Sequence, residues 1–251
     1  VVPYASPTPA PTPTPDPVPP PPPTPGTYLL QDGFDEVNRD YSQIAHVTGT
    51  AFFEHLAGGG WDGRGCLKFV PPGLDAVNNY YSGLAFYPLP QEVDTLYIRW
   101  CLYLGADIPN TTDGSKLIIV GRSGAPGEPP NPRLMCFIHK HQPGVVDMFI
   151  GNNVDRAAPY PAQFVIPLQE WISFEWGISL SGNWQRLWVT TRDRRFNDTL
   201  VDEIALSRQD GLLSGAEWGY WSPQNPITPD MYYLLDDLIH SQTKIGPPSG
   251  F

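Results

Sequence analysis

The chain has 251 residues, of which 26 are acidic and 15 basic, giving a formal net charge of −11. This balance argues against nucleic acid as a partner, because a phosphate-binding surface needs clustered lysine and arginine. No apolar run reaches the roughly 20 residues that a membrane-spanning helix requires, so the sequence predicts no membrane span. The chain begins at Val1 rather than methionine, which suggests a processed, extracellular protein.

The first 26 residues form a segment dominated by proline and threonine. Proline lacks a backbone N–H, so we expect neither a helix nor a central strand here, but an extended arm rising about 3.1 Å per residue. Hydroxyls beside prolines are typical of O-glycosylated stalks. The candidate positions are Ser6, Thr8, Thr12, Thr14 and Thr24. A plain linker is the alternative interpretation.

After the arm, the pattern changes to short runs rich in aromatic and β-branched residues, separated by turn-forming residues. This pattern predicts a single all-β domain over 27–251, a sandwich or a barrel. Gly182 and Asn183, between two apolar runs, predict a hairpin. The strands are expected at 28–34, 41–47, 66–70, 81–86, 96–104, 116–120, 133–141, 145–150, 172–180, 184–191, 199–206, 217–221 and 232–241.

The cysteines stand in apolar stretches and lack the CxxC spacing of a zinc or redox site. They are Cys66, Cys101 and Cys136. The chain could form at most one internal disulfide, and we favour buried thiols over an intermolecular link, since the flanking residues are of core type.

Four segments resemble strands of the concanavalin A-like lectin and glucanase superfamily, including its polysaccharide-lyase and laminin G-like branches. YLLQDGFD resembles its first strand, LYIRWCLYL a long central strand, WISFEWGISLSGNWQRLWVTTRD a two-strand hairpin, and YYLLDDLIHSQTKIG the terminal strand. The resemblance covers 28–246 and implies a two-sheet jelly-roll sandwich with one concave face. Enzymes and binding proteins share these motifs, so they leave the function open.

A lyase is the sharpest enzymatic hypothesis. Arg99 could neutralise a uronate carboxylate while His139 or His141 acts as the base, beside Tyr97 or Tyr103. Lyases of this fold typically carry Arg-x-Glu-x-Arg and Gln-x-His strands, and the chain matches neither. For both histidines, a solvated strand end is therefore the favoured interpretation.

Hydrolysis by a retaining glucanase route is disfavoured, since no two carboxylates stand in the Glu-x-Asp-x-Glu spacing. Acidic residues on the terminal strand more often fix a loop or a structural calcium ion. The candidate calcium ligands are Asp32, Asp35 and Asp237. No other cofactor is expected.

Aromatic rings can stack on the apolar face of a pyranose, and the platform candidates are Trp218, Tyr220 and Trp221, which stand near glycine and serine. Asn110 in NTT and Asn197 in NDT match the N-glycosylation pattern.

The leading functional hypothesis is a structural subunit of a glycosylated extracellular filament. In this hypothesis the arm docks on the next copy, with the apolar residues Val1, Val2 and Tyr4 adding as an edge strand. The alternatives are a secreted carbohydrate-binding module and a polysaccharide lyase.

Overall fold

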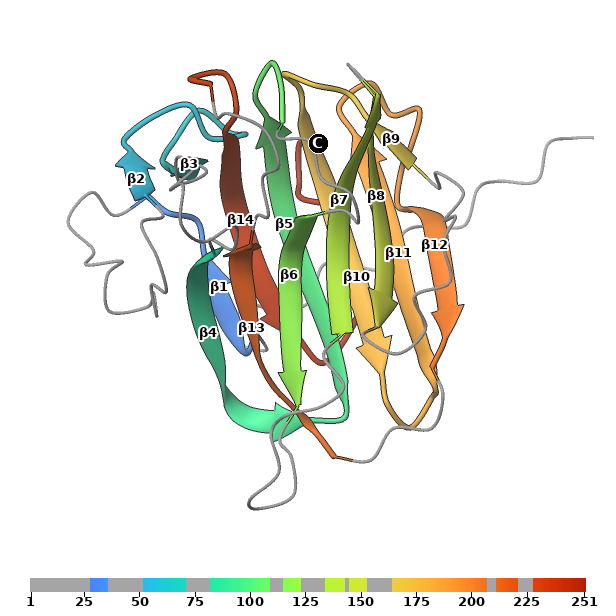
Figure 1. Ribbon diagram of the computed structural model, residues 1–251. Helices are drawn as coiled ribbons and strands as arrows, with labels where there is room; N and C mark the ends of the chain where they lie inside the picture. Colours follow the sequence, from blue (N-terminus) through green and yellow to red (C-terminus); the bar gives the residue numbers. More distant parts are fainter. Residues whose placement is uncertain are drawn as a thin grey trace, which may run out of the picture.

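Two antiparallel β-sheets stacked face to face make up the computed structural model (Figure 1). It describes residues 28–35, 52–70, 82–108, 115–122, 134–142, 145–152, 164–206, 211–220 and 228–251. All named elements in these ranges are strands. None of the described residues belongs to a helix that is long and apolar enough to cross a membrane.

The larger sheet has eight strands in the order β12-β11-β10-β5-β14-β3-β2, with β1 paired to β14. In chain order its strands are β1 (Leu30–Asp32), β2 (Phe52–Leu56), β3 (Cys66–Val70), β5 (Thr95–Leu104), β10 (Trp171–Ser179), β11 (Trp184–Thr191), β12 (Thr199–Ala205) and β14 (Tyr233–Ser241).

The smaller sheet has six strands in the order β4-β13-β6-β7-β8-β9 and lies in front in Figure 1. Its strands are β4 (Ser82–Val93), β6 (Ser115–Arg122), β7 (Leu134–Gln142), β8 (Val145–Asn152), β9 (Phe164–Ile166) and β13 (Leu213–Tyr220). Some neighbours are consecutive in sequence, such as β10 and β11, and others are distant, such as β5 and β14 or β4 and β13, as in a jelly roll.

The predicted all-β sandwich is confirmed, and most predicted strands lie within a few residues of the observed ones. The hairpin is also confirmed: β10 and β11 are joined at Asn183, which has a φ of 55°. The predictions missed the short strands β2 and β9 and began β13 four residues late, at 217 instead of 213. The predicted strand 41–47 lies outside the described residues, as do the whole arm 1–26, Asn110 and Trp221.

Alternation along the strands builds the core between the sheets. In β5, Ile98, Trp100 and Leu102 are at most 1% exposed and face the six-stranded sheet. Trp100 stacks on Phe174 at 5.5 Å between ring centroids and meets Trp218 edge-on at 5.4 Å. Since Trp218 lies in β13 of the other sheet, these rings join the two sheets at the centre of the sandwich.

The outer face of the eight-stranded sheet is covered in its middle by residues after β14. The backbone N–H groups of Ile245 and Gly246 donate to Glu175 at 2.6 and 2.8 Å. Arg99 Nη1 donates to the Gly246 carbonyl oxygen at 2.9 Å. This C-terminal strap, residues 242–251, ends with Phe251 packed against Trp61 at 5.3 Å. As a result, Arg99 and Glu175 are buried even though their side chains point away from the core.

Candidate functional site

The structure separates the residues of the lyase hypothesis. Tyr97, Arg99 and Tyr103 lie on β5 in the eight-stranded sheet, whereas His139 lies on β7 in the six-stranded sheet. Arg99 is bound to Asp237 at 2.7 Å and to the strap, so it is a structural cation. The side chain of His141 lies outside the described part of the chain. The proposed grouping of arginine, histidine and tyrosine is therefore wrong, because alternation predicts a face of a strand but not the sheet to which the strand belongs.

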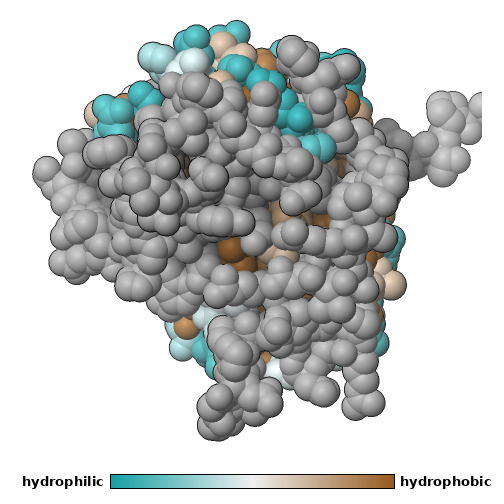
Figure 2. Space-filling view, in the orientation of Figure 1, coloured by the Kyte–Doolittle hydropathy of each residue, from teal (hydrophilic) through white to brown (hydrophobic). Residues whose placement is uncertain are grey.

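The outer face of the six-stranded sheet holds a hydrophobic cluster next to a polar pair. Ile119, Met135 and Phe137 form a cluster separate from the main core. Farther along β7, His139 is the direct cross-strand partner of Asp147 on β8. Figure 2 shows a small brown, hydrophobic patch near the middle of this face, and the three side chains of the cluster are at most 3% exposed.

The pair of His139 and Asp147 combines a half-buried imidazole with a buried carboxylate, which is 1% exposed. Directly opposed residues of an antiparallel pair have Cβ atoms about 4.5–5.5 Å apart. Side chains at that distance can interact directly across the two strands. This arrangement could perform acid–base chemistry or hold a polar ligand group. The sequence pattern points to His139 but not to Asp147, because the two residues become neighbours only when β7 and β8 pair.

The predicted calcium ligands do not converge. Asp32 accepts from the backbone N–H of Phe34 at 3.0 Å, Asp35 pairs with Arg64 at 2.6 Å, and Asp237 pairs with Arg99. Within the described ranges, no group of three or more histidine, cysteine or acidic side chains could hold a metal ion. The three residues therefore do not fit one calcium site.

Asp236 is the buried acid of the terminal strand. A one-residue bulge between Asp236 and Ile239 shifts β14 against β5. The Asp236 carboxylate accepts from the backbone N–H groups of Trp61, at 3.0 Å, and of Asp237, at 2.6 Å. Burial raises its pKa to about 7, although these two hydrogen bonds lower it. The expectation that acids here fix a loop is met by Asp236, which holds the segment before β3 onto β14.

The prediction that Trp218 forms part of an exposed aromatic platform is wrong. Trp218 is 0% exposed and belongs to the core, because alternation in β13 turns it inward with Ala216. Neighbouring glycine and serine are a poor indicator of exposure inside a strand. The side chain of Tyr220 lies outside the described part of the structure.

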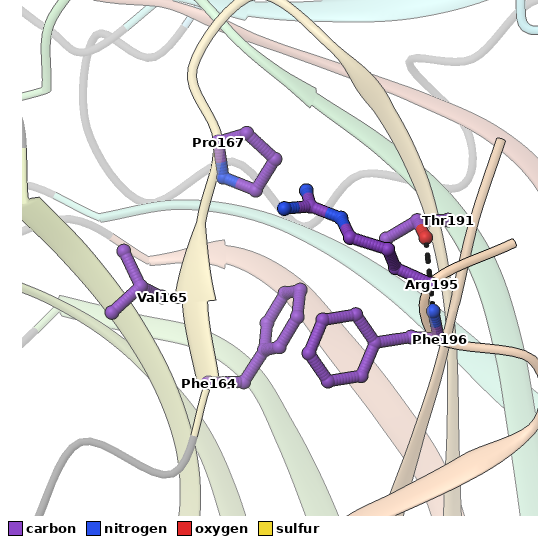
Figure 3. A pocket seen from close by; sticks show the side chains of 6 residues that line it. All are labelled: Phe164, Val165, Pro167, Thr191, Arg195 and Phe196. Atoms are coloured by element: carbon purple, nitrogen blue, oxygen red, sulfur yellow. Dashed lines mark hydrogen bonds between the residues drawn. The ribbon is translucent and has the colours of Figure 1, made fainter. Parts of the chain in front are cut away.

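An apolar cavity of about 470 Å³ opens at one edge of the sandwich, between β9 and the turn after β11 (Figure 3). Phe164 and Phe196 meet edge-on in it at 4.9 Å. Its polar groups are already engaged: Thr191 donates to Asp193 at 2.6 Å and accepts from the N–H of Phe196, and Arg195 pairs with Asp193 at 2.7 Å. The cavity therefore lacks the convergent polar groups of a specific ligand site.

No protein-family model matches the chain, and no curated protein matches it. Among solved structures, it is similar to the endo-β-1,4-glucuronan lyase from the fungus Trichoderma reesei, with a TM-score of 0.58, 9% identity, and coverage of 86% of this chain and 96% of the lyase. It is equally similar to the cellulose induced protein Cip1, with a TM-score of 0.58, 16% identity, and coverage of 87% and 100%. A family 131 β-glucanase catalytic domain from Podospora anserina gives a TM-score of 0.52, 10% identity, and coverage of 90% and 100%.

The chain has the fold of a two-sheet jelly roll. Identities this low establish the fold of the jelly roll and not its activity. The fold implied by the strand motifs is thereby confirmed.

The cysteines of the jelly roll are all buried thiols, and none forms a disulfide. Cys66 and Cys101 lie in the eight-stranded sheet and Cys136 in the six-stranded sheet, each 0% exposed. The prediction of buried thiols is confirmed. Of the two N-glycosylation candidates, Asn197 is exposed in the turn between β11 and β12.

Proposed function

We propose that this jelly roll is an extracellular carbohydrate-active protein that binds a polysaccharide against the outer face of its six-stranded sheet. The observation that carries the proposal is the pairing of His139 with Asp147 beside the cluster of Ile119, Met135 and Phe137. The three apolar side chains are at most 3% exposed, so they pack beside the site, and the half-buried His139 is the group that a sugar hydroxyl can reach. The likeness to a glucuronan lyase and a β-glucanase supports the same class of ligand.

This proposal replaces the filament subunit as the leading hypothesis. The filament hypothesis depends on an arm whose residues, Val1, Val2 and Tyr4 among them, lie outside the described ranges. The similar solved structures include carbohydrate-active proteins. An extracellular location is supported by the Pro/Thr-rich composition of the arm and by the exposed glycosylation candidate Asn197.

Eliminative cleavage of a uronate polysaccharide is the second candidate, favoured by the same pair. His139 would take the proton from C5, the electrons would form the C4–C5 double bond, and the C4–O4 bond would break as O4 takes a proton from water. The uronate carboxylate must also be neutralised. Lys140 is engaged by Asp107 and by the carbonyl of Ile108, so it does not meet this need.

Replacing His139 with alanine is expected to weaken polysaccharide binding by about tenfold, because one oriented polar contact is worth about 1.5 kcal/mol. The measurement is affinity electrophoresis of the full chain in gels containing neutral or uronate polysaccharides. Unsaturated uronate, detected by ultraviolet absorbance, reports cleavage in the same samples. If the chain is a lyase, the variant should lose about 10²-fold or more in rate.

His55→Ala is the matched control, since His55 is also half-buried but lies on β2 in the other sheet. Unchanged binding and cleavage in His139→Ala, or equal losses in both variants, would refute this site.

A further inference from the structure

An aromatic cluster lies on the opposite side of the molecule, on the outer face of the eight-stranded sheet. Tyr97 on β5 lies 6.1 Å from Trp184 and 6.2 Å from Trp188, measured between ring centroids, and both tryptophans belong to β11. All three side chains are half-buried, so each presents part of its ring to solvent. They belong neither to the core cluster nor to the face with His139.

A glycine makes this arrangement possible. Gly177 on β10 pairs with Tyr97 on one side and with Arg186 on the other. A Cβ atom at Gly177 would lie 2.9 Å from Trp188, 2.9 Å from Tyr97 and 3.0 Å from Trp184, which is too close for carbon atoms. The absence of a side chain in the middle strand therefore lets the rings from both neighbouring strands lean together. They form a nearly continuous aromatic surface across β5, β10 and β11.

A cation lies over one face of each tryptophan ring. The Arg186 guanidinium lies 4.7 Å from the Trp184 ring centroid and pairs with Glu203 at 2.8 Å. The Lys244 ammonium lies 4.9 Å from the Trp188 ring centroid and pairs with Asp198. Rings flanked by hydrogen-bonding groups are the usual means by which proteins hold a sugar, with the rings against C–H faces and the polar groups at the hydroxyls.

The charges also indicate the class of sugar. Each cation beside the rings is matched by a carboxylate, so the rim offers no net positive charge to a uronate. Burying a further carboxylate here would cost free energy without a compensating cation. A neutral polysaccharide carries only hydroxyl groups. These can donate hydrogen bonds to the carboxylate of each ion pair and accept hydrogen bonds from its cation.

We propose that Tyr97, Trp184 and Trp188, around Gly177, form a second carbohydrate-binding surface that takes a neutral polysaccharide chain. This surface is independent of the face with His139, because the two lie on opposite sides of a sandwich whose sheets are about 10 Å apart. The jelly roll would then hold glycan on both faces, a neutral chain here and its other polysaccharide at the six-stranded sheet.

The test is affinity electrophoresis of the full chain in gels containing hydroxyethyl cellulose, xyloglucan, arabinoxylan or galactomannan, with alginate as the acidic comparison. Trp184→Ala and Trp188→Ala should each weaken binding to at least one neutral polymer by about tenfold, whereas Trp188→Phe, which keeps a ring, should retain most of it. Binding to alginate should be unchanged by any of the three substitutions. Unfolding midpoints of the variants show that the fold is retained.

Trp171→Ala is the matched control, because Trp171 is also half-buried, on the same face, and contacts Tyr103 outside the cluster. Equal losses in Trp171→Ala would indicate adsorption to any exposed ring and would overturn the proposal. Loss of neutral binding in His139→Ala alone would also overturn it, and would leave the site on the six-stranded sheet standing. If the chain binds no neutral polymer, the second surface is refuted, while the proposed site at His139 is unaffected.

Discussion

Trp100→Ala should lower the free energy of unfolding by about 3–5 kcal/mol, the usual cost of removing a fully buried large aromatic side chain. Trp100 is 0% exposed and contacts Phe174 in its own sheet and Trp218 in the other. Its removal would leave a cavity at the centre of the sandwich and break the contact between the sheets. Denaturant unfolding of the variant and the natural chain at pH 7 gives the difference.

Trp171→Ala is the control for this prediction. Trp171 is half-buried at the end of β10, so its removal should cost only about 1 kcal/mol. Trp100→Phe should lie between the two, because it keeps a ring but loses part of the contact area. Similar destabilisation by Trp100→Ala and Trp171→Ala would show that the centre of the sandwich is not where its stability is concentrated.

Stability is expected to depend on pH through Asp236. Burial raises the pKa of this carboxyl from 3.8 to about 7, and the neighbouring acids Asp62 and Asp237 add to the rise. A raised pKa means that the folded state favours the protonated form. The contribution of the protonated Asp236 carboxyl to folding stability is therefore fully present below pH 3.8 and is lost as pH rises through 7. The shift corresponds to about 4 kcal/mol, at about 1.4 kcal/mol per pH unit.

Another titrating group acts in the opposite direction. Burial lowers the pKa of His240 from 6.5 to about 3, so its neutral folded form loses stability as pH falls below 6.5. The pH curve of the natural chain alone would mix both effects. The informative quantity is the difference in unfolding free energy between the natural chain and Asp236→Asn, measured from pH 4 to pH 8. The natural chain should lose stability relative to the variant as pH rises.

Parallel pH curves for the two proteins would contradict the shift at Asp236. The measurements need a chelator, since a divalent cation at the carboxylate would hold it ionised. Repeating them with added calcium tests the expectation of a structural calcium ion. An increase in stability at pH 8 that is absent in Asp236→Asn would place such an ion at Asp236 rather than at the three acids named from the sequence.

The sequence predicts individual strands well because alternation is a local property. The strand of Cys66–Val70 and that of Trp184–Thr191 have the predicted bounds. Alternation at β13 would have placed Trp218 inside, had it been given more weight than the neighbouring glycine and serine.

The site could not be predicted in the same way, because it depends on which strands pair. In a jelly roll, β5 pairs with β10 and β14, while β6 pairs with β7 and β13. These pairings put Arg99 and His139 on different sheets, although their strands carry similar patterns. The contact of Glu175 with the strap joins residues 70 positions apart, so no local sequence pattern predicts it.

Because the three thiols are buried, their reactivity reports how often the jelly roll opens. Burial raises the pKa of Cys66 to about 12 and that of the other two thiols well above the ordinary value, so a thiol reagent in neutral buffer reacts only with molecules that have opened. Labelling rates at Cys66 and Cys101 follow the eight-stranded sheet, and the rate at Cys136 follows the other. Equal rates would show that the sheets separate and unfold as one cooperative unit, whereas a faster rate at Cys136 would show that the six-stranded sheet opens while its partner stays folded.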